Sequence, residues 1–165
     1  METKSWEITG YRGRPMPNRF YAFEESKTMV VFLPGIRYTN DAPVLYYPRS
    51  LALERGWDVL AVDYQYGFDK RFQDLPGNAR DRWIGQDGEA LAAAINGADR
   101  YDRVILVAKS LGTMVAAKLL DAGLDHPPEG LVARLHPGQA EQPGRDGRDH
   151  LGAPAAERFG AEGRG

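Results

Sequence analysis

A chain of 165 residues that is 42% hydrophobic and 27% charged is long enough for one globular domain with a buried core, and its formal charge of −2 gives no sign of binding to nucleic acid or to an anionic membrane. It contains no cysteine, which excludes disulfides, thiolate metal sites and a cysteine nucleophile. The N-terminus is polar and no segment has the length of a membrane span, so we expect a cytoplasmic protein with no membrane partner.

The first part of the chain predicts three strands and a helix. Ser5–Gly10 and Arg19–Glu24 alternate loosely between apolar and polar residues, which is typical of a pair of edge strands. The run Thr28–Leu33 predicts a buried strand, and Pro43–Gly56 has the spacing of a surface helix. The apolar positions expected in this helix include Leu45, Leu51 and Leu53.

The next part predicts strands and helices in alternation. Trp57–Tyr64 is a strand pattern, Gln65–Arg80 is polar and aromatic without a steady period and predicts a loop, and Asp81–Gly97 has helical spacing. A further strand, Val104–Ala108, precedes a helix over Thr113–Leu120. Strands that alternate with helices in this way predict an α/β fold with a mostly parallel sheet, flanking helices and right-handed crossovers.

The segment from Arg103 to Gly112 carries the main chemical signal. Its unbroken apolar run predicts a strand buried on both faces, and it leads directly through Ala-Lys-Ser-Leu-Gly into a helix. A strand, a tight turn with a central serine and a helix form the layout of a nucleophile elbow, with Ser110 exposed at the carboxyl edge of the sheet. Small residues on either side, Ala108 and Gly112, allow strand and helix to approach closely. The competing interpretation is a serine that only caps an ordinary helix.

On these residues the chain resembles the α/β-hydrolase superfamily, in particular its small serine hydrolases. The family motif is Gly-x-Ser-x-Gly, and this chain has Ala108 in place of the first glycine. The resemblance extends from Met1 to about Leu135 and implies an α/β-hydrolase-like sheet that lacks the C-terminal strands of the family.

The resemblance implies a hydrolase of the carboxylesterase or thioesterase type that forms an acyl-Ser110 intermediate on a small-molecule acyl substrate. Ser110 is the candidate nucleophile, and the backbone N–H of Leu111 is the first candidate donor to the oxyanion. The second candidate donor is the N–H of Ile36, in the loop where the family often has His-Gly-x and this chain has Pro34-Gly35-Ile36. No cofactor and no metal are expected.

The catalytic acid and histidine remain unassigned. The family places them after later strands, whereas the only histidines here, His126, His136 and His150, lie in or beside an irregular segment. Asp63 is interpreted as a structural carboxylate that bonds loop groups, and Lys109 as a surface or loop-contacting side chain rather than a base. The tyrosines of the pairs Tyr46-Tyr47 and Tyr64-Gln65-Tyr66 fit either an acyl pocket or simple packing.

The chain divides, on this interpretation, into a partial α/β-hydrolase domain at 1–135 and an irregular, disordered tail at 136–165. Gly130–Leu135 fits one further strand, but the residues after it are rich in Gly, Ala, Pro and Arg and lack apolar periodicity. We expect this tail to be the product of a frameshift or a misplaced gene end. The alternative to an enzyme is therefore a non-catalytic hydrolase-like fragment or interaction protein. The sequence predicts no oligomeric state.

Overall fold

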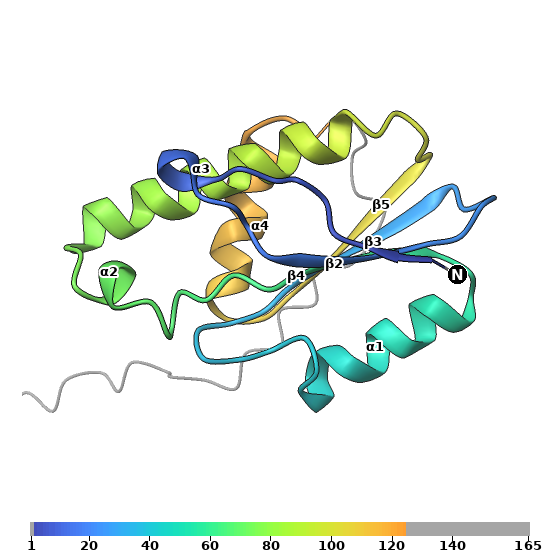
Figure 1. Cartoon of the computed structure of the whole chain (residues 1–165), viewed down its shortest axis with the longest axis horizontal. Helices are drawn as coiled ribbons and strands as arrows, with labels where there is room; N and C mark the ends of the chain where they lie inside the picture. The colour runs from blue at the N-terminus through green and yellow to red at the C-terminus, as the bar shows by residue number, and fades with distance from the viewer. Residues whose placement is uncertain (1, 125–165) are drawn as a thin grey trace, which may run out of the picture.

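The computed structural model describes residues 2–124, which form a twisted five-stranded sheet between two layers of helices (Figure 1). The strands are β1 (Glu2–Lys4), β2 (Asn18–Ala22), β3 (Thr28–Leu33), β4 (Asp58–Val62) and β5 (Arg103–Ala108). The helices are α1 (Pro43–Glu54), α2 (Lys70–Gln73), α3 (Gly77–Asn96) and α4 (Leu111–Asp121), with a short 3-10 turn, η1, at Tyr11–Gly13. The predicted α/β class is confirmed.

The sheet has the strand order β1-β2-β4-β3-β5. β1 and β2 pair antiparallel, β2 runs antiparallel to β4, and β4, β3 and β5 are parallel. β3 is bonded on both sides, and every one of its residues is buried, as its apolar sequence predicts. The carboxyl ends of β4, β3 and β5 therefore meet at one edge, where the loops that follow these strands gather.

Helices cover both faces of the sheet: α1 lies on one face, and α3 and α4 lie on the other (Figure 1). The alternation of side chains along β3 divides the core between them. Met29, Val31 and Leu33 belong to the larger cluster under α3 and α4, while Val30 and Phe32 pack in the smaller cluster with Leu45 of α1. In α1 the buried positions are Leu45, Arg49 and Ala52, whereas Leu51, another apolar position of the expected surface helix, is 47% exposed.

Two predicted boundaries are wrong. The first strand, β1, is at Glu2–Lys4 and not at the expected Ser5–Gly10. Within Ser5–Gly10, the backbone N–H and carbonyl of Trp6 form hydrogen bonds with the Asn18 side chain and not with a neighbouring strand. The expected loop at Gln65–Arg80 contains α2 and the first turn of α3. The start of α3 lacks apolar periodicity because most of its side chains before Trp83 face solvent.

The expectation that β5 is buried on both faces is also wrong. Val104, Leu106 and Ala108 are buried, but Ile105 and Val107 are only partly buried. α1 packs over β3 and β4, so the same face of β5 is less well covered. Among residues 2–124, β3 is the only strand that pairs with β5, which places β5 at an edge of the sheet as described.

Several expectations lie outside the described residues. These are the strand at Gly130–Leu135, the division of the chain at 135 and 136, and the interpretation of 136–165 as a tail from a frameshift or misplaced gene end. In the described part of the chain, no helix combines the length and apolar character needed to cross a membrane.

Two glycines of α3 test the packing of this helix on α4. A Cβ at Gly88 would lie 2.6 Å from the Lys118 Cβ, whereas a Cβ at Gly85 would meet nothing within 4 Å. We expect Gly88→Ala to lower the free energy of unfolding by about 1–3 kcal/mol through overpacking. Gly85→Ala should raise it by about 0.5–1 kcal/mol, because alanine favours an open helical position. Urea denaturation of both variants measures the difference, and equal effects would contradict the close helix contact.

Candidate active site

Ser110 lies at a sharp turn between β5 and α4. Its backbone has φ 52° and ψ −120°, a combination that glycine adopts readily and a residue with a side chain rarely adopts. The N–H of Gly112 donates to the carbonyl of Lys109 at 2.9 Å and closes the turn around the serine. Ser110 is exposed, and its side chain makes no capping hydrogen bond to α4. The geometry therefore disagrees with a simple helix cap and matches the strained elbow that the sequence predicts.

The turn is held against the end of β3. The N–H of Lys109 donates to the carbonyl of Leu33 at 3.0 Å. A Cβ at Gly112 would lie 2.1 Å from the same carbonyl oxygen, so the absence of a side chain lets α4 begin directly beside β3. Gly35 lies close to the serine itself, because a Cβ at this position would be 2.9 Å from the Cβ of Ser110. Both glycines are thus required by close approach to the serine turn.

The two candidate oxyanion donors flank this turn. Leu111 is the first residue of α4, where backbone N–H groups have no partner within the helix. Ile36 follows Gly35 in the loop after β3, and its side chain is 47% exposed. No hydrogen bond in the described residues uses the N–H of either Ile36 or Leu111. Both groups are therefore available to a bound oxygen atom, and the helix N-terminus favours negative charge there.

Asp63 is held in a network of hydrogen bonds at the end of β4. Arg19 donates to both of its carboxylate oxygens, at 2.7 and 3.1 Å, and the buried Asn40 side chain donates to one of them at 2.9 Å. Arg19 also bonds Asp41, and the two carboxylates raise the pKa of the guanidinium, while its hydrogen bond lowers the pKa of Asp41. The carboxylate of Asp63 is thus held by a strand arginine and by the Asn40 side chain, rather than by the loop N–H groups that the sequence interpretation assigned to it.

Lys109 points onto an aromatic ring. Its Nζ lies 4.3 Å from the centroid of the Tyr38 ring, in the loop after β3, which fits the expected loop-contacting side chain.

A pair of tyrosines anchors the loop after β4. Tyr64 donates its hydroxyl to the carbonyl of Pro34 at 2.8 Å, which ties this loop to the one that precedes Gly35. Tyr66 stacks on Tyr64 and donates to the buried carboxylate of Asp87 at 2.5 Å. Burial raises the pKa of Asp87, although hydrogen bonds from Tyr66, the Tyr11 N–H and Trp83 oppose this rise. Both tyrosines also line a cavity, whereas Tyr46 and Tyr47 are exposed on α1.

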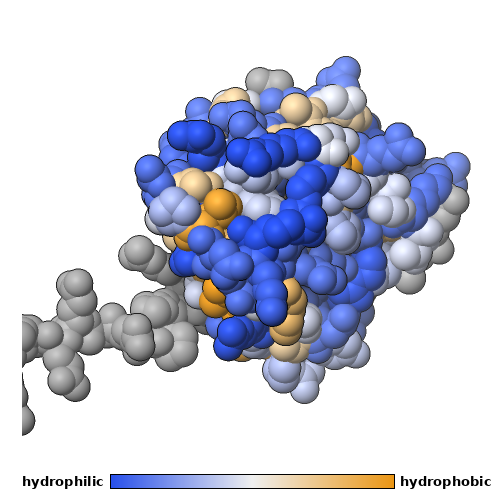
Figure 2. Space-filling view, turned by 60° about the vertical axis from the view of Figure 1, so that its left-hand side comes forward, coloured by the Kyte–Doolittle hydropathy of each residue, from blue (hydrophilic) through white to orange (hydrophobic). Residues whose placement is uncertain are grey.

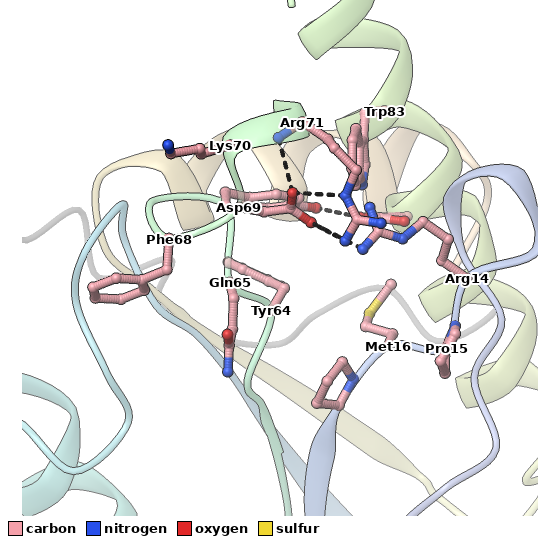
Figure 3. A pocket seen from close by; sticks show the side chains of 13 residues that line it. Arg14, Pro15, Met16, Tyr64, Gln65, Phe68, Asp69, Lys70, Arg71 and Trp83 are labelled. Carbon is pink, nitrogen blue, oxygen red and sulfur yellow. Dashed lines mark hydrogen bonds and ion pairs between the residues drawn. The ribbon is translucent and has the colours of Figure 1, made fainter. Parts of the chain in front are cut away.

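That cavity has a volume of about 470 Å³ and opens beside the loop after β4 (Figure 3). Arg14 and Arg71 converge on Asp69 at its rim, with Arg14 stacked over Trp83. Sequence reasoning missed this group because its members are far apart in the chain and carry no local motif. The lining residues are Arg14, Pro15, Met16, Pro17, Tyr64, Gln65, Tyr66, Phe68, Asp69, Lys70, Arg71, Trp83 and Asp87. Ser110 is not among them; the lining residue Tyr64 is linked to the serine turn through its bond to Pro34, which precedes Gly35.

No family model and no curated protein matches the sequence. Among solved structures, brefeldin A esterase, a bacterial homologue of human hormone sensitive lipase, superposes with a TM-score of 0.57 at 19% identity, over 76% of this chain and 37% of its own. An esterase from Pyrococcus furiosus gives 0.57 at 20% identity, over 76% and 48%. A protein from Agrobacterium vitis gives 0.52 at 23% identity, over 73% and 44%.

The chain has the α/β-hydrolase fold. The strand order, the antiparallel β2 and the turn at Ser110 are the features that carry this assignment. The chain spans less than half the length of each of these three structures.

The described part of the α/β-hydrolase fold does not contain a complete triad. Residues 2–124 include no histidine, and the three histidines of the chain, His126, His136 and His150, lie outside the described residues. Neither Asp63 nor Asp87 is bonded to Ser110: Asp63 is bonded by Arg19 and Asn40, and Asp87 by Tyr66 and Tyr11. The described residues also contain no group of three or more His, Cys, Asp or Glu side chains suited to a metal ion.

The backbone strain at Ser110 can be measured by comparing glycine with alanine. Glycine relieves a cost of about 1–3 kcal/mol at such a position but adds about 0.5–1 kcal/mol of chain entropy. We therefore expect Ser110→Gly to have a free energy of unfolding about 1 kcal/mol higher than Ser110→Ala. At Ser50, in the middle of α1, the order should be reversed, because alanine is favoured in a helix. The same order at both positions would contradict the strained turn.

The buried carboxyl of Asp87 predicts a pH dependence of stability. Its pKa is raised from 3.8, so the folded protein binds this proton more tightly than the unfolded chain. The resulting stabilisation is fully present below pH 3.8 and is lost as the pH rises through the raised pKa.

Asp87→Asn removes this ionisation and keeps an acceptor for the Tyr11 N–H. The free energy of unfolding of the wild type minus that of Asp87→Asn should therefore fall as the pH rises from about 4 to about 7. Asp81→Asn, on the exposed side of the same helix, controls for the loss of one charge. Urea titrations at each pH measure the difference, and a difference that grows with pH would show that the carboxylate is the favoured form.

Proposed function

We propose that the chain carries the nucleophile of a serine hydrolase that cleaves esters or thioesters through an acyl-Ser110 intermediate. The single observation that supports this most strongly is the backbone of Ser110, with φ 52° and ψ −120° at an exposed turn between a strand and a helix. A structural serine would gain nothing from this strain, whereas a nucleophile gains exposure and a fixed position beside backbone N–H donors.

In the proposed reaction, Ser110 Oγ attacks the carbonyl carbon of the substrate and gives its proton to a base. The tetrahedral oxyanion accepts hydrogen bonds from the N–H groups of Leu111 and Ile36, which are fixed before the substrate arrives. The alcohol or thiol then leaves with a proton, and the acyl group stays on Ser110 as an ester. Water attacks this ester in the second half of the cycle, which releases the acid and restores the hydroxyl.

The base is the component that residues 2–124 do not provide. By resemblance to the fold it is a histidine oriented by an acid, and these residues would have to come from outside the described part of the chain. We therefore propose that Ser110 is correctly placed but weakly activated in this chain. Hydrolysis then depends on residues beyond 124 or on a partner that completes the site.

The second candidate function is a hydrolase-like protein that binds without turnover. It is favoured by one observation, the absence of any histidine among the described residues that form the serine turn and its surroundings. Such a protein would keep the pocket and the scaffold while losing the chemical step.

Covalent labelling tests the nucleophile. We expect a fluorophosphonate probe to add to Ser110 alone, which is seen as one mass increment on the peptide that contains residues 110–118. Ser110→Ala should abolish it, while Ser50→Ala, which removes another serine near the protein surface, should leave it unchanged. Labelling of a different residue, or equal labelling of Ser110→Ala, would contradict the assignment.

Turnover of p-nitrophenyl acetate by the same preparations separates the two functions. A wild-type rate close to that of Ser110→Ala supports a scaffold without an activated nucleophile. A fast rate that His136→Ala or His150→Ala abolishes would instead show that the chain completes its own triad.

A further inference from the structure

The cavity beside the loop after β4 is built differently from the surroundings of Ser110. Aromatic and aliphatic side chains form its inner part, including Met16, Tyr64 and Trp83, and these three are buried in the protein. Its volume of about 470 Å³ lies within the range of about 300–1,000 Å³ that is typical of small-molecule sites. The end of the molecule that carries these loops is otherwise mostly hydrophilic, with small hydrophobic patches (Figure 2).

The rim of this cavity carries positive charge. Three cationic side chains, Arg14, Lys70 and Arg71, line the cavity together with one partly exposed carboxylate, Asp69. Arg14 and Arg71 both bond Asp69, at 2.9 and 3.0 Å, and together they hold the pKa of its carboxyl well below the ordinary value. The Lys70 side chain extends away from this group (Figure 3). Since the whole chain has a charge of −2, this concentration of cations is a local feature.

Both guanidinium groups retain donors for a second anion. Each has five N–H bonds. Arg14 uses one of them on Asp69, and Arg71 uses two. Asp69 thereby orients the two groups while it neutralises only one of their two charges. Arg14 is also fixed by its contact with the ring of Trp83, 4.8 Å from the centroid, so its orientation is set before any ligand binds.

The second carboxylate that lines the cavity, Asp87, repels a bound anion only weakly. Asp87 accepts hydrogen bonds from the Tyr66 hydroxyl and the Tyr11 N–H, and its pKa is raised by burial, which reduces its tendency to be charged. An anion at the rim therefore meets the arginine pair, while an apolar group attached to it meets Met16, Tyr64 and Trp83.

We propose that this cavity is a binding site for a small carboxylate with a flat apolar body. The carboxylate binds the free N–H groups of Arg14 and Arg71, and the apolar body lies against the aromatic floor. The site is a feature of this chain's own residues, and binding there does not require acylation of Ser110.

Calorimetry with a matched pair of ligands tests the proposal on the full chain. We expect 2-naphthoate to bind at least about tenfold more tightly than the neutral 2-naphthalenemethanol, because only the acid pairs with the arginines. Arg71→Gln, at an exposed side chain, should weaken naphthoate about fivefold and leave the alcohol unchanged. Lys27→Gln removes the same charge just before β3, at the edge of the sheet opposite to the loops that follow the parallel strands. It should leave both affinities unchanged.

Chemical-shift mapping locates the ligand. The backbone amide signals of Met16 and Gln65 should move on addition of naphthoate, in the wild type and equally in Ser110→Ala. The proposal is overturned by equal affinity for acid and alcohol, by equal effects of Arg71→Gln and Lys27→Gln, by shifts confined to Ile105 and Val107, or by no binding at millimolar ligand. Because Ser110→Ala retains the cavity, failure here is distinguishable from failure of the serine to react.

Discussion

The close contact between the end of β3 and the start of α4 is the constraint on which the site depends. α4 can begin beside the carbonyl of Leu33 only because Gly112 has no side chain, and the loop after β3 can cross Ser110 only because Gly35 has none. This contact forces the chain to turn within a few residues and gives Ser110 its positive φ. The fold thus uses the stability of the central strand to hold a local conformation that is unfavourable by itself.

Buried polar groups then fix the loops around that turn. Tyr64 joins the loop after β4 to Pro34, and Tyr66 joins it to Asp87 of α3. Asp63 ties the end of β4 to Arg19 of β2. These bonds leave the edge of the sheet with preformed surfaces, and catalytic and binding functions both benefit from groups that do not have to be ordered when a ligand arrives.

The fold followed from the sequence where apolar patterning controls the structure, as in the fully buried run of β3 and the turn after Ala108. Apolar patterning did not predict the structure correctly where exposure to solvent determines the residue types. The first turn of α3 is polar because it is exposed, and β5 is continuously apolar after Arg103 although Ile105 and Val107 are only partly buried. The serine turn was predictable because its residues are adjacent. The arrangement of Arg14, Asp69 and Arg71 was not, because only the folded chain brings Arg14 beside the start of α2.

The most direct test of the central claim is a crystal structure of the chain after reaction with a fluorophosphonate. We expect a phosphoryl group on Ser110 Oγ, a Ser110 φ near 52°, and one phosphoryl oxygen within hydrogen-bond distance of both the Leu111 and Ile36 nitrogens. An adduct whose oxygen points away from these nitrogens, or a Ser110 with an ordinary helical backbone, would contradict the claim that this turn is built for acyl transfer.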